Sequence, residues 1–245
     1  MKKLFLISSS YYKKGSFLEH CFVPLSKFMG VPEEGRNRIL FIPYARADRN
    51  YDGYTKQVAE PFIKLGYEVV GAHSYPNFRD CLSDMSICTV YVGGGNTWLL
   101  KNFLDINFLV GIKNRVENGI WKYVSASAGT VMAGSSMLTT NDMAPVIPRD
   151  SNGFGIVPFQ VNPHFIPGSL MKNHRGETRE ERLKQVILHN PEWQIVGLPE
   201  GCWIEKTTDE YILRGTSEIK AAIFRKDGNN SIWLKGEPYN SIGMM

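Results

Sequence analysis

The chain has 245 residues and a net charge of +4, with 43% hydrophobic and 21% charged residues. This length can bury a substantial core in one α/β domain, and the composition excludes an intrinsically disordered protein. No block of Lys and Arg is interleaved with aromatic residues, and no apolar run approaches a membrane span. These absences argue against nucleic-acid and membrane partners.

The first residues predict a strand rather than a signal peptide. Met1 to Lys3 is basic, but only four apolar residues follow before a run of serines. Four residues are too few for the core of a signal peptide. The four cysteines are scattered, without a C-x-x-C pair and without a histidine at zinc-ligand spacing. We therefore expect reduced thiols, no metal site and a cytoplasmic protein.

Strands and helices alternate through the first half of the chain. Short apolar or β-branched runs predict strands, and apolar residues at helical spacing predict helices. The predicted strands are Leu4–Ile7, Ile39–Ile42, Tyr67–Gly71, Ile87–Val92 and Ile120–Val124, and the predicted helices are residues 16–29, 52–65 and 97–118. This alternation predicts an α/β fold with a mostly parallel sheet and right-handed crossovers, in which ligands bind beyond the carboxyl ends of the strands.

The alternation weakens in the second half. Residues 143–158 are typical of a long loop, residues 177–189 of a helix, and residues 193–234 of short strands that end in turns. No internal repeat and no composition shift marks a domain boundary. We therefore expect a single domain over residues 1–245.

Ser127 lies where a predicted strand meets a short helical pattern. Its neighbours Ala126, Ala128 and Gly129 are all small. A serine on a sharp turn between strand and helix needs such neighbours, and the turn lifts its Oγ clear of the sheet. The usual G-x-S-x-G pattern reads Ser-Ala-Ser-Ala-Gly here, starting at Ser125. The alternative interpretation is a structural turn that packs a helix onto the sheet.

A nucleophilic serine also needs donors for the oxyanion. The glycines of the run Gly93–Asn96 directly follow a predicted strand. Glycines let the backbone approach a substrate closely, and successive amides can converge on one oxygen. Candidate donors are therefore the amides of Gly94, Gly95 and Ala128. A phosphate-binding or flavin-binding turn is the alternative interpretation of these glycines.

The candidate base is His164, because Pro163 and Phe165 on either side of it fix the direction of the ring. For the orienting acid there are two candidates. Glu200 lies between a proline and a glycine just after an apolar segment, and Asp142 lies in a polar loop. The alternative interpretation for either carboxylate is a side chain that caps a turn.

Six motifs follow one another along the chain: Gly93-Gly-Gly-Asn-Thr97, Ser127-Ala-Gly129, Thr139-Thr-Asn-Asp-Met143, Asn162-Pro-His-Phe165, Gly176-Glu-Thr-Arg-Glu180 and Gly197-Leu-Pro-Glu-Gly201. In this order they resemble the peptidase E family of serine peptidases over essentially the full length. The resemblance implies a three-layer, class I glutamine amidotransferase-like (flavodoxin-like) α/β fold. It also implies a cytoplasmic enzyme without cofactor that cleaves dipeptides with an N-terminal aspartate.

The resemblance assigns roles to three residues: Ser127 as the nucleophile, His164 as its base and Glu200 as the third member of the triad. The sequence departs from the family just before the nucleophile. A bulkier pair of the glycine-tryptophan type is expected there, where this chain has Ser125 and Ala126.

Arg179 is the candidate for substrate specificity. Thr178-Arg-Glu-Glu181 has the form of a capping box, which places Arg179 in the first turn of a helix. A cation there faces the positive end of the helix dipole, yet Arg179 shares a helix face with Leu183 and points inward. This placement predicts a bound anion, and the resemblance implies that this anion is the side chain of the substrate aspartate. An internal salt bridge to Glu177 or Glu205 is the alternative interpretation.

Two further residues are expected to bind the substrate. Asp142 is the candidate for the free α-ammonium, and Asn96 adds a polar group beside the glycines. Should Arg179 not read the aspartate, Arg175 and Lys172 are the next candidates. The predicted partner is thus a small peptide, and a homodimer remains open.

Two other functions are compatible with these patterns. A hydrolase of the cyanophycinase type shares the Ser-Ala-Gly turn and also reads aspartyl groups, although the glycine loop and the short chain favour the dipeptidase. A non-catalytic, flavodoxin-like module would instead use Gly93–Asn96 to bind a phosphate.

Overall fold

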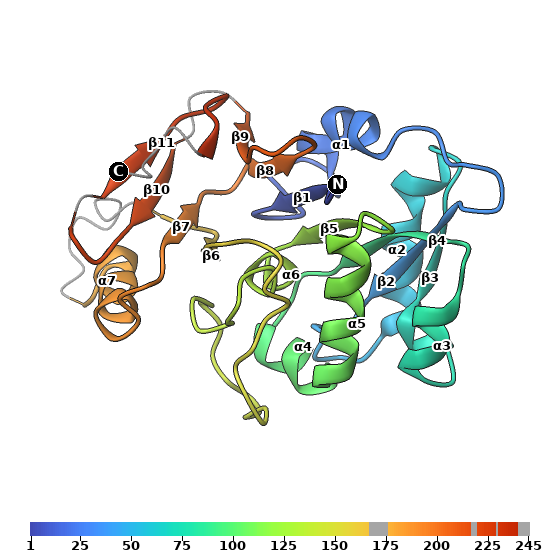
Figure 1. The fold of residues 1–245 in the computed structure, drawn as a ribbon, viewed down its shortest axis with the longest axis horizontal. Coiled ribbons are helices and arrows are strands. Elements are labelled where there is room, and N and C mark those ends of the chain that lie inside the picture. The colour runs from blue at the N-terminus through green and yellow to red at the C-terminus, as the bar shows by residue number, and fades with distance from the viewer. Residues whose placement is uncertain (167–175, 217–219, 229, 240–245) are drawn as a thin grey trace.

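The computed structural model describes residues 1–166, 176–216, 220–228 and 230–239 (Figure 1). Within these residues, seven strands form the central sheet. Their order across the sheet is β3 (Glu68–Gly71), β2 (Arg38–Ile42), β4 (Ile87–Val92), β5 (Lys122–Ala126), β1 (Leu4–Ile7), β8 (Cys202–Lys206) and β9 (Ile212–Gly215). The first five run parallel, whereas β8 and β9 are antiparallel additions. The predicted α/β class with a mostly parallel sheet is confirmed.

A second sheet lies beside the β8–β9 side of the central sheet (Figure 1). In the described residues it has four strands, in the order β11 (Ser231–Trp233), β10 (Ala221–Phe224), β7 (Ile195–Leu198) and β6 (Gln160–Pro163). Strands β6 and β7 are parallel, and Pro163 pairs with Leu198 at their ends. One short turn joins the end of β7 to the start of β8, so the two sheets meet at this turn.

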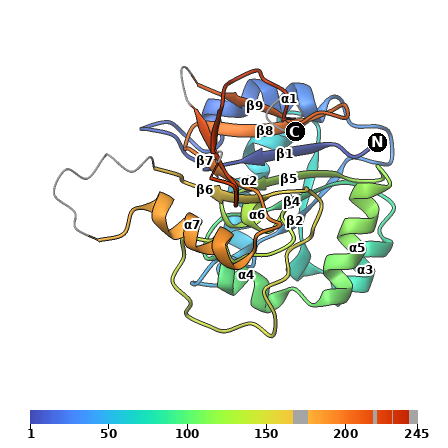
Figure 2. The ribbon, with the colours of Figure 1, turned by 60° about the vertical axis from the view of Figure 1, so that its left-hand side comes forward.

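Helices cover both faces of the central sheet (Figure 2). The helices are α1 (Phe22–Met29), α2 (Tyr51–Ile63), α3 (Phe78–Ser83), α4 (Thr97–Phe103), α5 (Ile106–Glu117), α6 (Ala128–Val131) and α7 (Arg179–His189), with 3-10 turns η1 (Glu19–Cys21) and η2 (Ala72–Ser74). Successive side chains of a strand point to opposite faces. Phe5 of β1 therefore packs in one cluster with residues of α1 and α2, and Leu6 in the other with residues of α3 to α5. The result is three layers.

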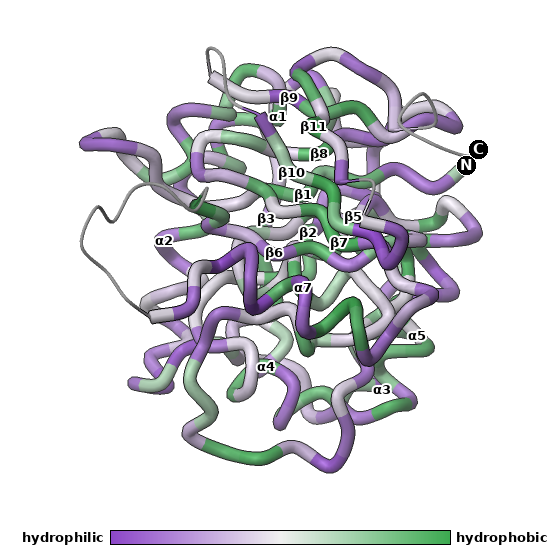
Figure 3. Tube along the Cα trace, turned by 90° about the vertical axis from the view of Figure 1, so that its left-hand side faces the viewer, coloured by the Kyte–Doolittle hydropathy of each residue, from purple (hydrophilic) through white to green (hydrophobic). Residues whose placement is uncertain are grey.

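Hydrophobic segments run through the strands at the centre of the molecule, whereas the outer loops and helices carry both hydrophilic and hydrophobic segments (Figure 3). All four residues of β1 and the last four of β2 are buried. Strands buried on both faces read as continuous apolar runs, which is why these segments were recognisable in the sequence. No helix among the described residues is long and apolar enough to cross a membrane.

Several predicted boundaries were wrong. The strand predicted at Ile120–Val124 runs from Lys122 to Ala126, so it ends directly at Ser127. The helical patterns across residues 97–118 form two helices, because Asp105 caps a new one by accepting from the amide of Phe108. The helix predicted for residues 16–29 begins only at Phe22, after the 3-10 turn. Helix α3, which Asn77 caps, was not predicted at all.

Candidate active site

Ser127 sits in a strained turn at the carboxyl end of β5. Its φ of 51° and ψ of −113° form a conformation that costs energy for any residue other than glycine. Backbone hydrogen bonds hold the turn: its amide donates to Ile7 O (3.1 Å), and its carbonyl accepts from Thr130 N (2.8 Å) and Val131 N (3.0 Å). The sequence thus predicted the strand, sharp turn and helix in the right order, although α6 has only four residues.

The small residues around Ser127 are explained by close backbone contacts. A Cβ on Gly129 would lie 2.2 Å from Val92 O, so only glycine lets α6 approach β4. A Cβ on Gly94 would lie 3.1 Å from the Cβ of Ser127. Ser125, where the sequence departs from the family, is buried, and its Oγ lies 2.9 Å from Thr130 Oγ1. That hydroxyl therefore has a partner in the core.

Three predicted residues are brought together by the fold. Ser127 Oγ lies 2.8 Å from His164 Nε2, and His164 Nδ1 lies 2.6 Å from Glu200 Oε1. The carboxylate beside Nδ1 places the ring proton on that nitrogen, which leaves Nε2 free to accept from the serine hydroxyl. A ring oriented in this way can take the proton of Ser127 while the oxygen attacks a carbonyl carbon.

The second sheet supplies the histidine and the glutamate. His164 follows β6 directly, with a positive φ of 54°. Glu200 lies in the turn between β7 and β8, which the bond from Cys202 N to Pro199 O closes. This turn needs glycine at position 201, because its φ is 78° and a Cβ would lie 2.8 Å from a ring carbon of Tyr12.

Of the three predicted oxyanion donors, one already donates a hydrogen bond to another residue of the protein. The amide of Gly94 donates to Tyr54 Oη at 3.0 Å, and Tyr54 Oη lies 3.2 Å from Gly94 O. Burial raises the pKa of Tyr54 to about 12, so the phenol keeps its proton. The amides of Gly95 and Ala128 have no acceptor within the part of the chain that the structure describes. Two of the three candidate amides are therefore unoccupied.

Asn96 and Asp142 both shape the start of α4. Asn96 Oδ1 accepts from the amides of Trp98 and Leu99, and its Nδ2 donates to Met143 O (2.9 Å). Both the oxygen and the nitrogen of its side-chain amide are thus hydrogen-bonded within the protein.

Asp142 also binds the first residue of this helix. Its Oδ2 accepts from Thr97 N (2.7 Å), Thr97 Oγ1 (2.6 Å) and Thr140 Oγ1 (2.9 Å). The carboxylate that contacts His164 Nδ1 is that of Glu200, whereas the hydrogen bonds of the Asp142 carboxylate go to Thr97 and Thr140.

Arg179 occupies the first turn of α7. The predicted capping box is present: Thr178 Oγ1 accepts from Glu181 N (3.2 Å), and Glu181 Oε2 accepts from Thr178 N (2.6 Å). The half-buried Arg179 donates through Nη1 to Asn162 Oδ1 at 3.5 Å. Burial lowers the pKa of the guanidinium, as does nearby Arg182, and Asp142 opposes this shift.

The alternative partners of Arg179 are engaged elsewhere. Glu177 pairs with Arg182, and Glu205 with Arg214. Among the described residues, Arg179 has no carboxylate within ion-pair distance. Arg175 and Lys172, the other candidate cations, lie outside the described residues.

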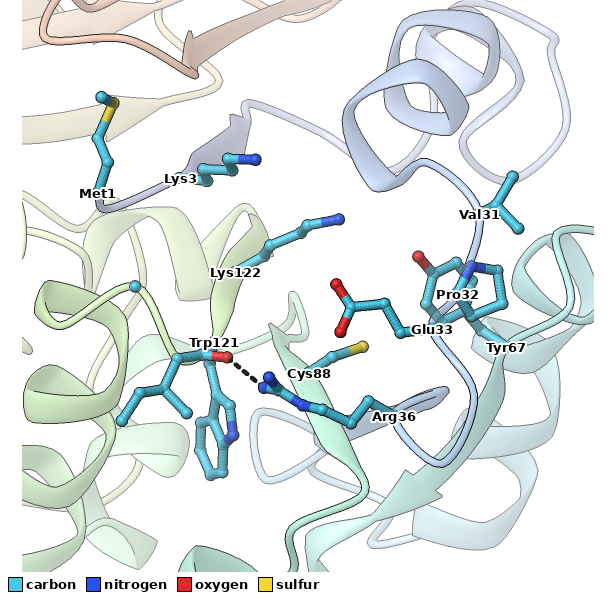
Figure 4. Close-up of a pocket in the computed structure, with 12 residues that line it drawn as sticks. Met1, Lys3, Val31, Pro32, Glu33, Arg36, Tyr67, Cys88, Trp121 and Lys122 are labelled. Atoms are coloured by element: carbon cyan, nitrogen blue, oxygen red, sulfur yellow. Dashed lines mark hydrogen bonds between the residues drawn. The ribbon is translucent and has the colours of Figure 1, made fainter.

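A separate cavity of about 170 Å³ lies at the opposite edge of the central sheet (Figure 4). Lys3, which precedes β1, Lys122, which begins β5, and Tyr67, which precedes β3, all line it. They mark the amino ends of the strands, whereas Ser127 follows the carboxyl end of β5. This cavity is not part of the site around Ser127.

A model of peptidase family S51 matches residues 4–214. The chain belongs to peptidase family S51. It is 40% identical over 202 residues to peptidase E of Haemophilus influenzae (strain ATCC 51907 / DSM 11121 / KW20 / Rd), which covers 82% of this chain and 90% of the relative. It is 37% identical over 214 residues to peptidase E of Salmonella arizonae (87% and 90% covered). Family membership identifies this chain as a serine-type peptidase, a hydrolase.

Two solved structures share the fold of this S51 chain. One is a peptidase from an acI-B1 actinobacterium, with a TM-score of 0.66, 19% identity and coverage of 97% of this chain and 96% of that one. The other is a proposed peptidase E protein from Listeria monocytogenes EGD-e, with a TM-score of 0.61, 19% identity and coverage of 89% and 100%. They confirm the predicted glutamine amidotransferase-like, flavodoxin-like fold.

Three residues of the site were not predicted from the sequence of this S51 peptidase. They are Tyr54, which binds Gly94, Asn162, which binds Arg179, and Ser8, which binds the backbone of His164. The sequence could have indicated Asn162, because it belongs to the same motif as His164. For Tyr54 and Ser8, no local pattern indicates a partner 40 or 156 residues away.

Proposed function

We propose that this S51 peptidase hydrolyses dipeptides with an N-terminal aspartate through the triad Ser127, His164 and Glu200. His164 takes the proton of Ser127 as Oγ attacks the peptide carbonyl, and Glu200 holds the ring and stabilises the imidazolium that forms. His164 then protonates the leaving amine, and water resolves the acyl-enzyme by the reverse path. The distances of 2.8 and 2.6 Å between the three side chains support these roles.

The oxyanion of the intermediate would lie against the amides of Gly95 and Ala128. Both lack an acceptor among the described residues; Ala128 directly follows Ser127, and Gly95 follows Gly94, where an added Cβ would lie 3.1 Å from the Cβ of Ser127. Preorganised amides of this kind are worth on the order of 10²–10³ in turnover each. Gly94 would contribute only after its amide leaves Tyr54, so in our proposal it shapes the loop instead.

The placement of Arg179 is the observation that most directly supports the proposed class of substrate. A half-buried guanidinium, whose one hydrogen bond in the described part of the chain goes to the neutral amide of Asn162, retains donors for an anion. Asn162 lies two residues before His164, so this cation belongs to the same site. A guanidinium binds a carboxylate through paired, charge-assisted hydrogen bonds. The side-chain carboxylate of an N-terminal aspartate is the anion we assign to it.

The remaining polar residues would complete the substrate site. Asp142 keeps Oδ1 without a hydrogen bond among the described residues, and we assign it to the free α-ammonium. Asn96 acts indirectly, because its amide caps α4 behind the glycine loop. We expect the enzyme to work in the cytoplasm on small peptides, without a metal or cofactor.

Hydrolysis of Asp-Leu, Asn-Leu and Ala-Leu by the purified protein tests this proposal, with Ser127→Ala as the matched control. We expect hydrolysis of Asp-Leu that treatment with EDTA does not change. In the Ser127→Ala variant we expect turnover to fall by several orders of magnitude, about 10⁶ in a comparable triad, with an unchanged Tm. Activity of the variant within about tenfold of wild type would refute the nucleophile. Activity that EDTA abolishes and zinc restores would refute the mechanism.

A further inference from the structure

We infer that Ser8 is a positioning residue that aligns the catalytic histidine with the nucleophile. This inference rests on the proposed triad. Ser8 directly follows β1, the strand between β5 and β8, and is fully buried. It therefore lies where the central sheet, which carries Ser127, meets the second sheet, which carries His164 and Glu200.

The hydroxyl of Ser8 is bound on both sides by the second sheet. Its Oγ accepts from the amide of His164 at 2.9 Å and donates to Leu198 O at 2.8 Å. The amide of Ser8 donates to Cys202 O at 3.0 Å. Leu198 and Cys202 flank the turn that carries Glu200, so one residue, through its side chain and its amide, contacts both the base and the ends of the segment that holds the acid.

The residue before Ser8 binds the nucleophile. Ile7 O accepts from the amide of Ser127 at 3.1 Å and from Thr130 Oγ1 at 2.7 Å. Two consecutive residues of one chain segment thus hold the backbones of both catalytic partners. This arrangement fixes the separation between Ser127 Oγ and His164 Nε2 through rigid backbone rather than through the side chains alone.

His164 needs this support because its φ is positive. The only acceptor of its amide among the described residues is Ser8 Oγ, and the next amide, that of Phe165, donates to Leu198 O at 3.1 Å. Removal of the hydroxyl would leave the amide of His164 without a partner, whereas Leu198 O would keep its bond from Phe165. The least costly relaxation is a shift of the His164 backbone, and catalysis is sensitive to such shifts: a displacement of about 1 Å costs about 10²-fold.

The test compares Ser8→Ala with Tyr67→Phe. Tyr67 is the matched control, because its buried hydroxyl donates to Met29 O at 2.8 Å at the opposite edge of the central sheet. We expect Ser8→Ala to lower kcat for Asp-Leu by about 10²-fold with KM within about threefold, because it misaligns the base and leaves Arg179 in place. We expect Tyr67→Phe to lower Tm while kcat stays at the wild-type value.

A second readout needs no peptide substrate. The rate at which an alkyl fluorophosphonate labels Ser127 should fall in Ser8→Ala in parallel with kcat. In the wild-type protein, the amide proton of His164 should exchange slowly with solvent, a measurement that does not depend on the variant folding.

Labelling of Ser8→Ala at the wild-type rate, an equal loss of kcat in Tyr67→Phe, or rapid exchange of the His164 amide would each overturn the inference about Ser8. If fluorophosphonate fails to label wild-type Ser127 and Asp-Leu is not cleaved, the triad itself is wrong. The two failures are therefore distinguishable.

Discussion

Ser127 and His164, the two residues that exchange a proton in the proposed mechanism, both take positive φ angles of 51° and 54°. Each such angle costs on the order of 1–3 kcal/mol for a residue other than glycine and persists only where the surroundings enforce it. Here the enforcing groups are Ile7 O and Ser8 Oγ, which bind the two amides. Each of the two residues directly follows a strand, and in this conformation their side chains meet at 2.8 Å.

Glu200, rather than Asp142, should orient His164. Substitution by the amide keeps the shape of either side chain and removes its charge. We expect Glu200→Gln to lower turnover by roughly 10⁴, as the analogous change does in a serine protease triad. We expect Asp142→Asn to act mainly on KM, because the Asp142 carboxylate binds Thr97 and Thr140, and the carboxylate bonded to the ring is that of Glu200.

Steady-state kinetics of both amide variants with Asp-Leu decides between the two acids. If Asp142→Asn lost most of the turnover while Glu200→Gln lost little, the assignment of the acid would be reversed.

Residues whose roles depend on local sequence could be predicted, and residues whose roles depend on distant contacts could not. Ser127 was recognisable from its small neighbours, and Arg179 from the capping box around it. Tyr54, by contrast, is one tyrosine in an ordinary amphipathic helix. Only the packing of α2 against the loop after β4 brings its hydroxyl to Gly94.

At the scale of elements, α7 determines where the guanidinium of Arg179 lies. Leu183 and Ile187 bury one face of the helix against Phe165, which follows β6, and Phe224 of β10. Arg179 is its first residue, so the order of the first turn controls the position of the guanidinium that we propose binds the substrate aspartate. Helix ends fray unless their free amides are capped.

Loss of the cap should therefore weaken binding of aspartate. We expect Thr178→Ala to destabilise the start of α7 by about 1 kcal/mol and to raise KM for Asp-Leu several-fold, with little change in kcat. Thr178→Ser, which keeps the hydroxyl, is the control and should behave as wild type. An unchanged KM in Thr178→Ala, with Asp-Leu as substrate, would show that the cap does not hold Arg179 in place.

The elements themselves were predictable where burial dominates, as in β1, β2 and β4, and less so where a single polar side chain decides a boundary. Asp105 breaks the apolar pattern of residues 97–118 into α4 and α5 by accepting from one amide. Asn77 starts the short helix α3 in the same way. Side chains of this kind also cap turns, so the sequence alone does not show that a helix begins there.

At the scale of the whole molecule, the candidate site lies at the meeting of two sheets. The central sheet carries Ser127 and the glycine loop, and the second sheet carries His164 and Glu200. In an open parallel sheet, ligands bind beyond the carboxyl ends of the strands, and this site follows that rule. The sequence predicted this edge for Ser127 and for the glycines. The sequence did not indicate that a second sheet would place the base and the acid beside Ser127. That placement depends on the pairing of β6 with β7, which are 35 residues apart.

The most direct test of the account is the ratio of kcat/KM for Asp-Leu to that for Asn-Leu, measured in wild type and in Arg179→Met. Methionine keeps the unbranched stem and removes the guanidinium. A hydrogen bond to a charged group contributes about 1.5–3 kcal/mol, so we expect the ratio to fall by about two orders of magnitude. Arg179→Lys should restore only part of it, because a point charge lacks the paired geometry. A ratio that Arg179→Met leaves unchanged would contradict the account, because another group would then read the aspartate.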